Sequence, residues 1–156
     1  MKNQCMHLTN YAINKNNKFE FNKDENDEST GHKRNLPFLW KHLDENGFDS
    51  KTTWAKIKDI IIKTLCSVQP SMAHLYHSCQ GDDVENSMCF EILGFDIIMD
   101  EKANPWLLEV NHAPSFTTDT PLDFRIKKGV ITDAIALLNL NYKKRLRYKA
   151  TEKLKF

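Results

Sequence analysis

Two acidic side chains interrupt the most apolar part of the sequence, where they could bind a cation. Asp96 lies in the run GFDIIM, and Glu109 lies in WLLEVN. If Met99 and Trp106 close a hairpin, Asp96 faces Glu109 directly and Asn111 projects from the same face, opposite a glycine. Two carboxylates and an amide oxygen suit a hard cation such as Mg²⁺, with phosphate oxygens and water in its remaining positions. The pattern predicts a magnesium–nucleotide site.

Two other interpretations of the acidic pair stay open at this point. Asp96 and Glu109 could pair with lysine or arginine, or they could lie on a solvated edge of the sheet. A register slip of one residue would place them on opposite faces and remove the site.

The hairpin predicted to carry this site has a turn of polar residues between two apolar runs. Residues 87–99 are rich in β-branched and aromatic side chains, and they predict a central strand covered on both faces. The turn formers DEKANP (100–105) and the strand 106–111 complete a β-hairpin.

Two amphipathic helices are expected around the hairpin. The first spans 52–68, with Thr52 or Thr53 as its N-cap and Pro70 ending it. The second spans 123–141, with Asp123 as its cap. In both helices the apolar residues recur at steps of three and four, so we expect them in the core. These residues are Trp54, Ile57, Ile61, Leu65 and Val68 in the first helix and Ile126, Val130, Ala134, Leu137 and Leu138 in the second.

Length and composition indicate an ordinary globular chain. It has 156 residues, a net charge of +1 and 40% hydrophobic residues, so about one domain is expected. No apolar run is long enough to cross a membrane, and the first residues lack the apolar region of a signal peptide, so we do not expect secretion. Four cysteines without a CxxC pair favour the cytoplasm.

Charge is distributed unevenly along the chain. Residues 22–35 contain no aliphatic, aromatic or cysteine side chain and predict an exposed polar loop. Residues 143–156 hold seven lysines and arginines against one glutamate, a local charge of +6 that leaves −5 for the rest. No nucleic-acid-binding motif accompanies this basic tail, so we expect neither a nucleic-acid nor a membrane partner.

Long motifs resemble the C-terminal part of tubulin-tyrosine-ligase-like proteins, which have an ATP-grasp fold. They are HLTN (7–10) and GFDIIMDEKANPWLLEVNHAPSFTTDTPLD (94–123), and NHAPSFTTD (111–119) is similar to the polyglutamylase branch. The resemblance implies an α/β fold with a mainly antiparallel sheet flanked by helices. Residues 1–142 would form the C-terminal part of the ATP-grasp domain, followed by the basic tail at 143–156.

The resemblance also implies an activity: an ATP-dependent ligase that makes an acyl-phosphate and joins glutamate to tubulin tails. The family's Mg²⁺ ligands correspond to Asp96, Glu109 and Asn111. Its nucleotide contacts in the HLTN segment correspond to Thr9 and Asn10. His112 distinguishes the polyglutamylase branch, and it would contact the acceptor or the incoming glutamate.

Partners and location follow from the same resemblance. The basic tail would suit the acidic tails of tubulin, and free glutamate would be the second substrate. We expect a monomer associated with microtubules, in the cytoplasm and at a cilium or basal body.

The chain begins at about the last third of the usual ligase core. The lysines that clamp the phosphates are expected upstream, so the chain is expected to be incomplete as a ligase. The alternative hypothesis is a catalytically inactive module that binds tubulin through its basic tail.

Overall fold

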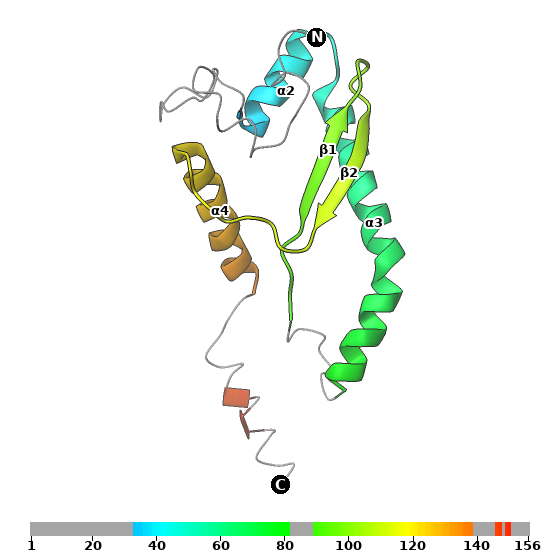
Figure 1. Cartoon of the computed structure of the whole chain (residues 1–156), viewed down its shortest axis with the longest axis vertical. Helices are drawn as coiled ribbons and strands as arrows, with labels where there is room; N and C mark the ends of the chain where they lie inside the picture. The colour runs from blue at the N-terminus through cyan, green and yellow to red at the C-terminus, as the bar shows by residue number, and fades with distance from the viewer. Residues whose placement is uncertain (1–32, 82–88, 139–145, 148, 151–156) are drawn as a thin grey trace. The chain divides into compact units, whose positions relative to one another are not determined.

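The computed structural model describes residues 33–81, 89–138, 146–147 and 149–150. These residues form a mixed α/β fold with an antiparallel two-stranded sheet, as predicted, and the arrangement is consistent with part of an ATP-grasp domain (Figure 1). The elements are, in order, α2 (Leu36–Glu45), α3 (Ser50–Cys79), β1 (Gly94–Met99), β2 (Pro105–Asn111) and α4 (Pro121–Leu137). Thr9, Asn10, most of the polar loop and most of the basic tail lie outside the described residues.

The chain divides into two compact units. Residues Arg34–Ser115 form one unit, which contains α2, α3 and the hairpin. The segments on either side of it, which include α4, form the other. No helix in the described ranges has the length and apolar character needed to cross a membrane.

Helix α2 is not among the two helices that the sequence predicted. The Asn35 side chain caps it by accepting a hydrogen bond from the Phe38 amide at 2.7 Å, and Pro37 in the first turn has the backbone angle that a helix start requires. Leu43 is buried, and Trp40 packs against Trp54 of α3 with 5.6 Å between ring centroids. The helix is therefore held by its cap and by an aromatic contact.

Helix α3 begins earlier and ends later than predicted. The N-cap is Asp49, so the prediction of Thr52 or Thr53 is wrong. The Asp49 carboxylate accepts hydrogen bonds from the Lys51 amide at 3.0 Å and from the Thr52 hydroxyl. The helix also continues through Pro70 to Cys79, so the predicted end at Pro70 is wrong. Proline removes a single intrahelical donor, and the turns on either side keep their own hydrogen bonds.

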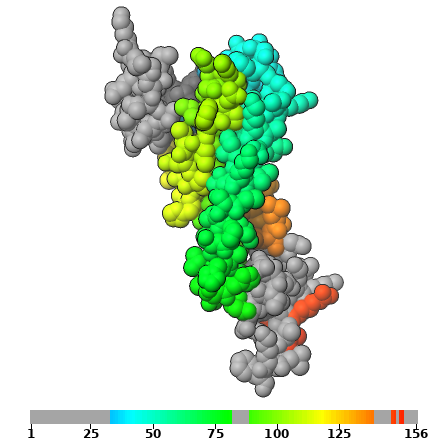
Figure 2. Space-filling model, turned by 90° about the vertical axis from the view of Figure 1, so that its right-hand side faces the viewer, coloured from blue at the N-terminus to red at the C-terminus, as the bar shows by residue number. Residues whose placement is uncertain are grey.

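Of the predicted apolar stripe of α3, only Ile57 is buried. Ile57 is buried as predicted, whereas Trp54 and Val68 keep 40% and 44% of their surface exposed and Leu65 is also exposed. The reason is that α3 contacts α2 and β2, and the hairpin lies beside its first half (Figures 1 and 2). Lys56 adds a polar contact there, donating to Asn104 Oδ1 at 2.8 Å.

The predicted long central strand is also shorter than expected. Strand β1 starts at Gly94, and Phe90 is exposed outside any strand. Exposed and half-buried residues alternate along β1, so it is not covered on both faces. Within the described ranges β2 is its single neighbouring strand, and a two-stranded sheet has too little area to bury both of its faces.

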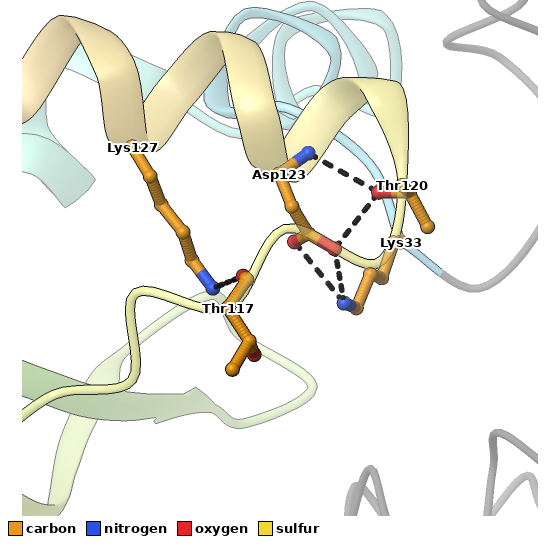
Figure 3. Close-up of polar contacts among 5 residues, drawn as sticks. All are labelled: Lys33, Thr117, Thr120, Asp123 and Lys127. Atoms are coloured by element: carbon orange, nitrogen blue, oxygen red, sulfur yellow. Dashed lines mark hydrogen bonds and ion pairs between the residues drawn. The ribbon is translucent and has the colours of Figure 1, made fainter.

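In the second unit, Thr120 rather than Asp123 caps α4 (Figure 3). Thr120 Oγ1 accepts from the Asp123 amide at 3.1 Å and donates to Asp123 Oδ2 at 2.9 Å. Lys33 Nζ lies 3.0 and 3.1 Å from the two Asp123 carboxylate oxygens, and Lys127 donates to the Thr117 carbonyl. The start of α4 is thus tied to Lys33 and to the segment that directly precedes the helix.

Asp123 is well shielded in this cluster, with 13% of its side chain exposed against 34% for Lys33. Partial burial acts to raise the pKa of Asp123, but hydrogen bonds from Lys33 and Thr120 outweigh it and the pKa is lowered. The predicted burial of the α4 stripe is wrong: the helix has no buried residue, and Ile126 and Val130 are half exposed. An apolar stripe is buried only where another surface covers it.

Candidate functional site

The hairpin brings the two predicted carboxylates together. Asp96 pairs with Glu109 across the strands, and Gly94 pairs with Asn111, as the sequence pattern predicted. Closer to the turn the prediction is wrong, because Met99 pairs with Pro105 and not with Trp106. The register therefore changes by one residue within the hairpin.

A β-bulge between Asp96 and Ile97 accounts for this change. Ile97 pairs with Leu107 and Asp96 pairs with Glu109, so Leu108 has no partner across the sheet. A register continued unbroken from the turn would place Leu108 opposite Asp96 and turn Glu109 to the other face. The bulge is thus the structural feature that pairs the two carboxylates.

The turn that sets this offset is held by Asp100. Its Oδ1 accepts from the backbone amides of Lys102 and Asn104 at 2.9 and 2.8 Å. Ala103 adopts a positive φ of 57° and is buried. Hydrogen bonds from the Asn104 backbone are the main cause that lowers the pKa of Asp100 to about 2.

Asn111 completes the cluster on the carboxylate face. Its Nδ2 lies 3.1 Å from Glu109 Oε1 and 3.5 Å from Asp96 Oδ2. The glycine opposite it leaves the room that the sequence pattern predicted: a Cβ on Gly94 would lie 3.2 Å from Pro114 Cβ and 3.6 Å from Asn111 Cβ. Three oxygen-bearing side chains therefore converge from two strands.

The carboxylates are exposed, although the strands around them are apolar. Within the described part of the chain neither carboxylate forms an ion pair with lysine or arginine, so the structure does not show the ion-pair interpretation of Asp96 and Glu109 there. Partial burial of Asp96 and the Glu109 carboxylate beside it raise the pKa of Asp96, and the hydrogen bond from Asn111 opposes this shift. Among the residues that the structure describes, the two carboxylates of the site have no cationic side chain paired with them.

The donor set fits one hard divalent cation. No group of three or more His, Cys, Asp or Glu side chains suited to a metal occurs in the described ranges. Two carboxylates and one amide provide only oxygen ligands and leave positions for water and phosphate oxygens, as Mg²⁺ requires. Asp96, Glu109 and Asn111 could hold that ion.

Of the other predicted site residues, His112 is the nearest in sequence. It directly follows β2, in a bend, and its side chain is exposed. The predictions for Thr9 and Asn10 fall outside the described residues. The pairing of Lys33 with Asp123 was missed, because nothing local in the sequence links residues 90 positions apart.

The fold and the site define an α/β chain with a candidate oxygen-ligand cation centre, and comparisons with known proteins place it further. The sequence profile of the Tubulin-tyrosine ligase family matches residues 1–146. The chain therefore belongs to the tubulin-tyrosine ligase family.

Several relatives are similar over nearly the whole chain. A probable beta-tubulin polyglutamylase of Tetrahymena thermophila is 54% identical over 92% of the chain. Tubulin polyglutamylase TTLL6 of Homo sapiens is 48% identical over 87%, and the human tubulin polyglutamylase TTLL7 is 41% identical over 95%. These matches cover only 12%, 15% and 17% of the respective relatives, so the chain spans less than a fifth of their length.

Proposed function

We propose that this chain supplies the cation-binding hairpin of an ATP-dependent ligase that adds glutamate to tubulin tails. The observation that carries the proposal is the pairing of Asp96 with Glu109, with Asn111 Nδ2 3.1 Å from the Glu109 carboxylate. Membership of the family and the names of the relatives support the reaction class.

The proposed cation is Mg²⁺, held by Asp96, Glu109 and Asn111. When bound it would offset the charge of the ATP phosphates, which is the main electrostatic requirement of phosphoryl transfer. The hairpin positions the three ligands: the bulge at Leu108 keeps both carboxylates on one face, and Gly94 leaves room for the Asn111 side chain beside them. Such preset geometry lowers the cost of orienting ligand and ion.

The remaining residues have proposed roles in substrate contact. Thr9 and Asn10 have hydroxyl and amide groups that can hydrogen-bond ribose or phosphate oxygens. His112, exposed directly after Asn111, can donate to a carboxylate of the acceptor or of free glutamate. The whole reaction, with tubulin as acceptor at microtubules, is proposed for a larger enzyme of which residues 1–142 form the C-terminal part of the ATP-grasp domain.

Titration calorimetry of the 156-residue chain with MgCl₂, and then with Mg–ATP, tests the cation site. We expect Asp96→Asn and Glu109→Gln to weaken Mg²⁺ binding by at least about tenfold, because each removes one anionic ligand. Glu101→Gln is the matched control, since it makes the same charge change in the turn of the same hairpin. Equal binding by the wild type and all three variants would refute the site.

A second candidate function is tubulin binding without catalysis, favoured by the local charge of +6 over residues 143–156. Cosedimentation with microtubules at several salt concentrations separates the two functions. Salt-sensitive pelleting together with no response to Mg–ATP would favour the inactive binder.

A further inference from the structure

The Asn111 side chain presents the wrong atom for a metal ligand. Its amide nitrogen, and not its oxygen, lies against the carboxylates, at 3.1 Å from Glu109 Oε1 and 3.5 Å from Asp96 Oδ2. Ionised carboxylates only accept hydrogen bonds, so the donor end of the amide must face them when no cation is present. A divalent cation binds only the oxygen end.

We propose that Asn111 is a two-position side chain that exchanges its amide nitrogen for its oxygen when a divalent cation enters the site. The inference rests on the proposed function, because it assumes that the cation binds between the same carboxylates. Without a cation, the amide N–H groups partly offset the repulsion between Asp96 and Glu109. With a cation, that role passes to the ion and the amide turns about its terminal torsion.

The surroundings of Asn111 allow this rotation. The terminal torsion of asparagine is broad and roughly twofold, so exchanging nitrogen for oxygen needs no backbone change. The residue opposite is Gly94, which adds no side-chain atoms, and the neighbouring carboxylates are exposed. The two positions differ in which partner the amide satisfies, and so the cation selects between them.

Nuclear magnetic resonance of the full chain during a MgCl₂ titration tests the exchange. The carboxyl ¹³C signals of Asp96 and Glu109 report whether the site fills, and the side-chain NH₂ signals of Asn111 report its orientation. We expect the carboxyl signals and the Asn111 signals to move together. The Asn111 amide protons should lose the chemical shifts typical of hydrogen-bonded protons and should exchange faster with water. Carboxyl signals that move while the Asn111 signals stay fixed would overturn the inference and leave the proposed function standing.

Carboxyl signals that do not move during the titration would instead overturn the cation site, and the inference with it. Two variants give an independent readout from urea unfolding and Mg²⁺ affinity. Asn111→Asp keeps an oxygen ligand but loses the donor, so the metal-free chain should be less stable while Mg²⁺ affinity is kept or raised by roughly fivefold. Asn111→Leu loses both, so stability and affinity should both fall.

Asn104→Asp is the matched control, because Asn104 Nδ2 donates to Asp100 Oδ2 at 3.1 Å in the turn of the same hairpin. This variant should lose stability without changing Mg²⁺ affinity. Mg²⁺ affinity unchanged in Asn111→Leu, or metal-free stability unchanged in Asn111→Asp, would contradict the two-position side chain.

Discussion

Replacing Asp96 by asparagine should change stability in opposite directions with and without Mg²⁺. The substitution keeps the side-chain shape but removes one of two like charges that face each other across β1 and β2. Without a cation, this removal relieves repulsion. With a cation, it removes a ligand.

The magnitude follows from the geometry of the pair. Two unit charges about 5 Å apart repel by about 0.8 kcal/mol in water; cross-strand pairs in sheets contribute about 0.2–1 kcal/mol when favourable, and directly opposed like charges are destabilising. Because Asp96 is exposed, the lower values apply, and we expect Asp96→Asn to raise the unfolding free energy of the metal-free chain by about 0.5 kcal/mol. The pKa of Asp96 is raised first by its partial burial and then by the same Glu109 carboxylate.

This pKa shift also fixes the sign of the pH dependence. A carboxyl group with a raised pKa in the folded chain holds its proton more tightly there than in the unfolded chain. Its contribution to stability is therefore fully present below the ordinary value of 3.8 and is lost as pH rises through the raised pKa. Asp96→Asn should remove that part of the pH dependence.

Binding of Mg²⁺ reverses the order of stability. At a concentration of about 100 times the wild-type Kd, a bound ion stabilises the wild type by about 2.7 kcal/mol, whereas a variant that binds about tenfold more weakly should gain about 1.4 kcal/mol. Urea unfolding followed by circular dichroism, with and without MgCl₂, measures both differences. Glu101→Gln again serves as control and should follow the wild type in both conditions.

Two results would refute the reasoning. A metal-free Asp96→Asn variant that is less stable than the wild type would mean that the carboxylate pair is not repulsive. A variant that gains as much stability from Mg²⁺ as the wild type would mean that Asp96 is not a ligand.

Three further predictions concern the elements that hold the hairpin and α4. Asp100→Asn should reduce the loss of stability on acidification, because the pKa of Asp100 is lowered to about 2 in the folded chain. The stability that this carboxylate contributes is fully present above the ordinary pKa of 3.8 and is lost as pH falls through about 2. Urea midpoints across this pH range measure the difference, and the same pH dependence in variant and wild type would contradict the prediction. Thr120→Ala should destabilise α4 by about 1 kcal/mol through loss of its cap, while Thr120→Ser should not; amide hydrogen exchange in the first turn of α4 distinguishes them, and equal exchange in both would exclude the capping role. Pro70→Ala should stabilise α3 by about 1–3 kcal/mol, because it restores a helical donor; slower amide exchange between Pro70 and Cys79 would show this, and faster exchange would disprove it.

Part of the fold could be read from local patterns. The turn formers between two apolar runs predicted the hairpin, and the α3 region was predicted as a helix from its apolar spacing. The cap positions were less predictable, because Asp49 and Thr120 compete with neighbouring residues that could serve the same role. The presence of Pro70 predicts the end of the helix there, but α3 continues through it to Cys79.

Burial was the property that local patterns predicted least well. Apolar spacing places Val68 and Ile126 on one face of each helix, and both are exposed. Periodicity defines a face, but only a packed neighbour removes that face from water. Lys33 and Asp123 show the same principle for charge, since their contact joins residues 90 positions apart.

By itself the sequence determined which residue types could bind a cation and that Asp96 and Glu109 lie on facing strands, because strand periodicity and turn chemistry are local. The tertiary structure decided the register that pairs them. The turn between Met99 and Pro105 sets an offset of one residue, and the bulge at Leu108 absorbs it, so that Glu109 and not Leu108 faces Asp96. Register depends on hydrogen bonds between two strands, and no single strand contains that information.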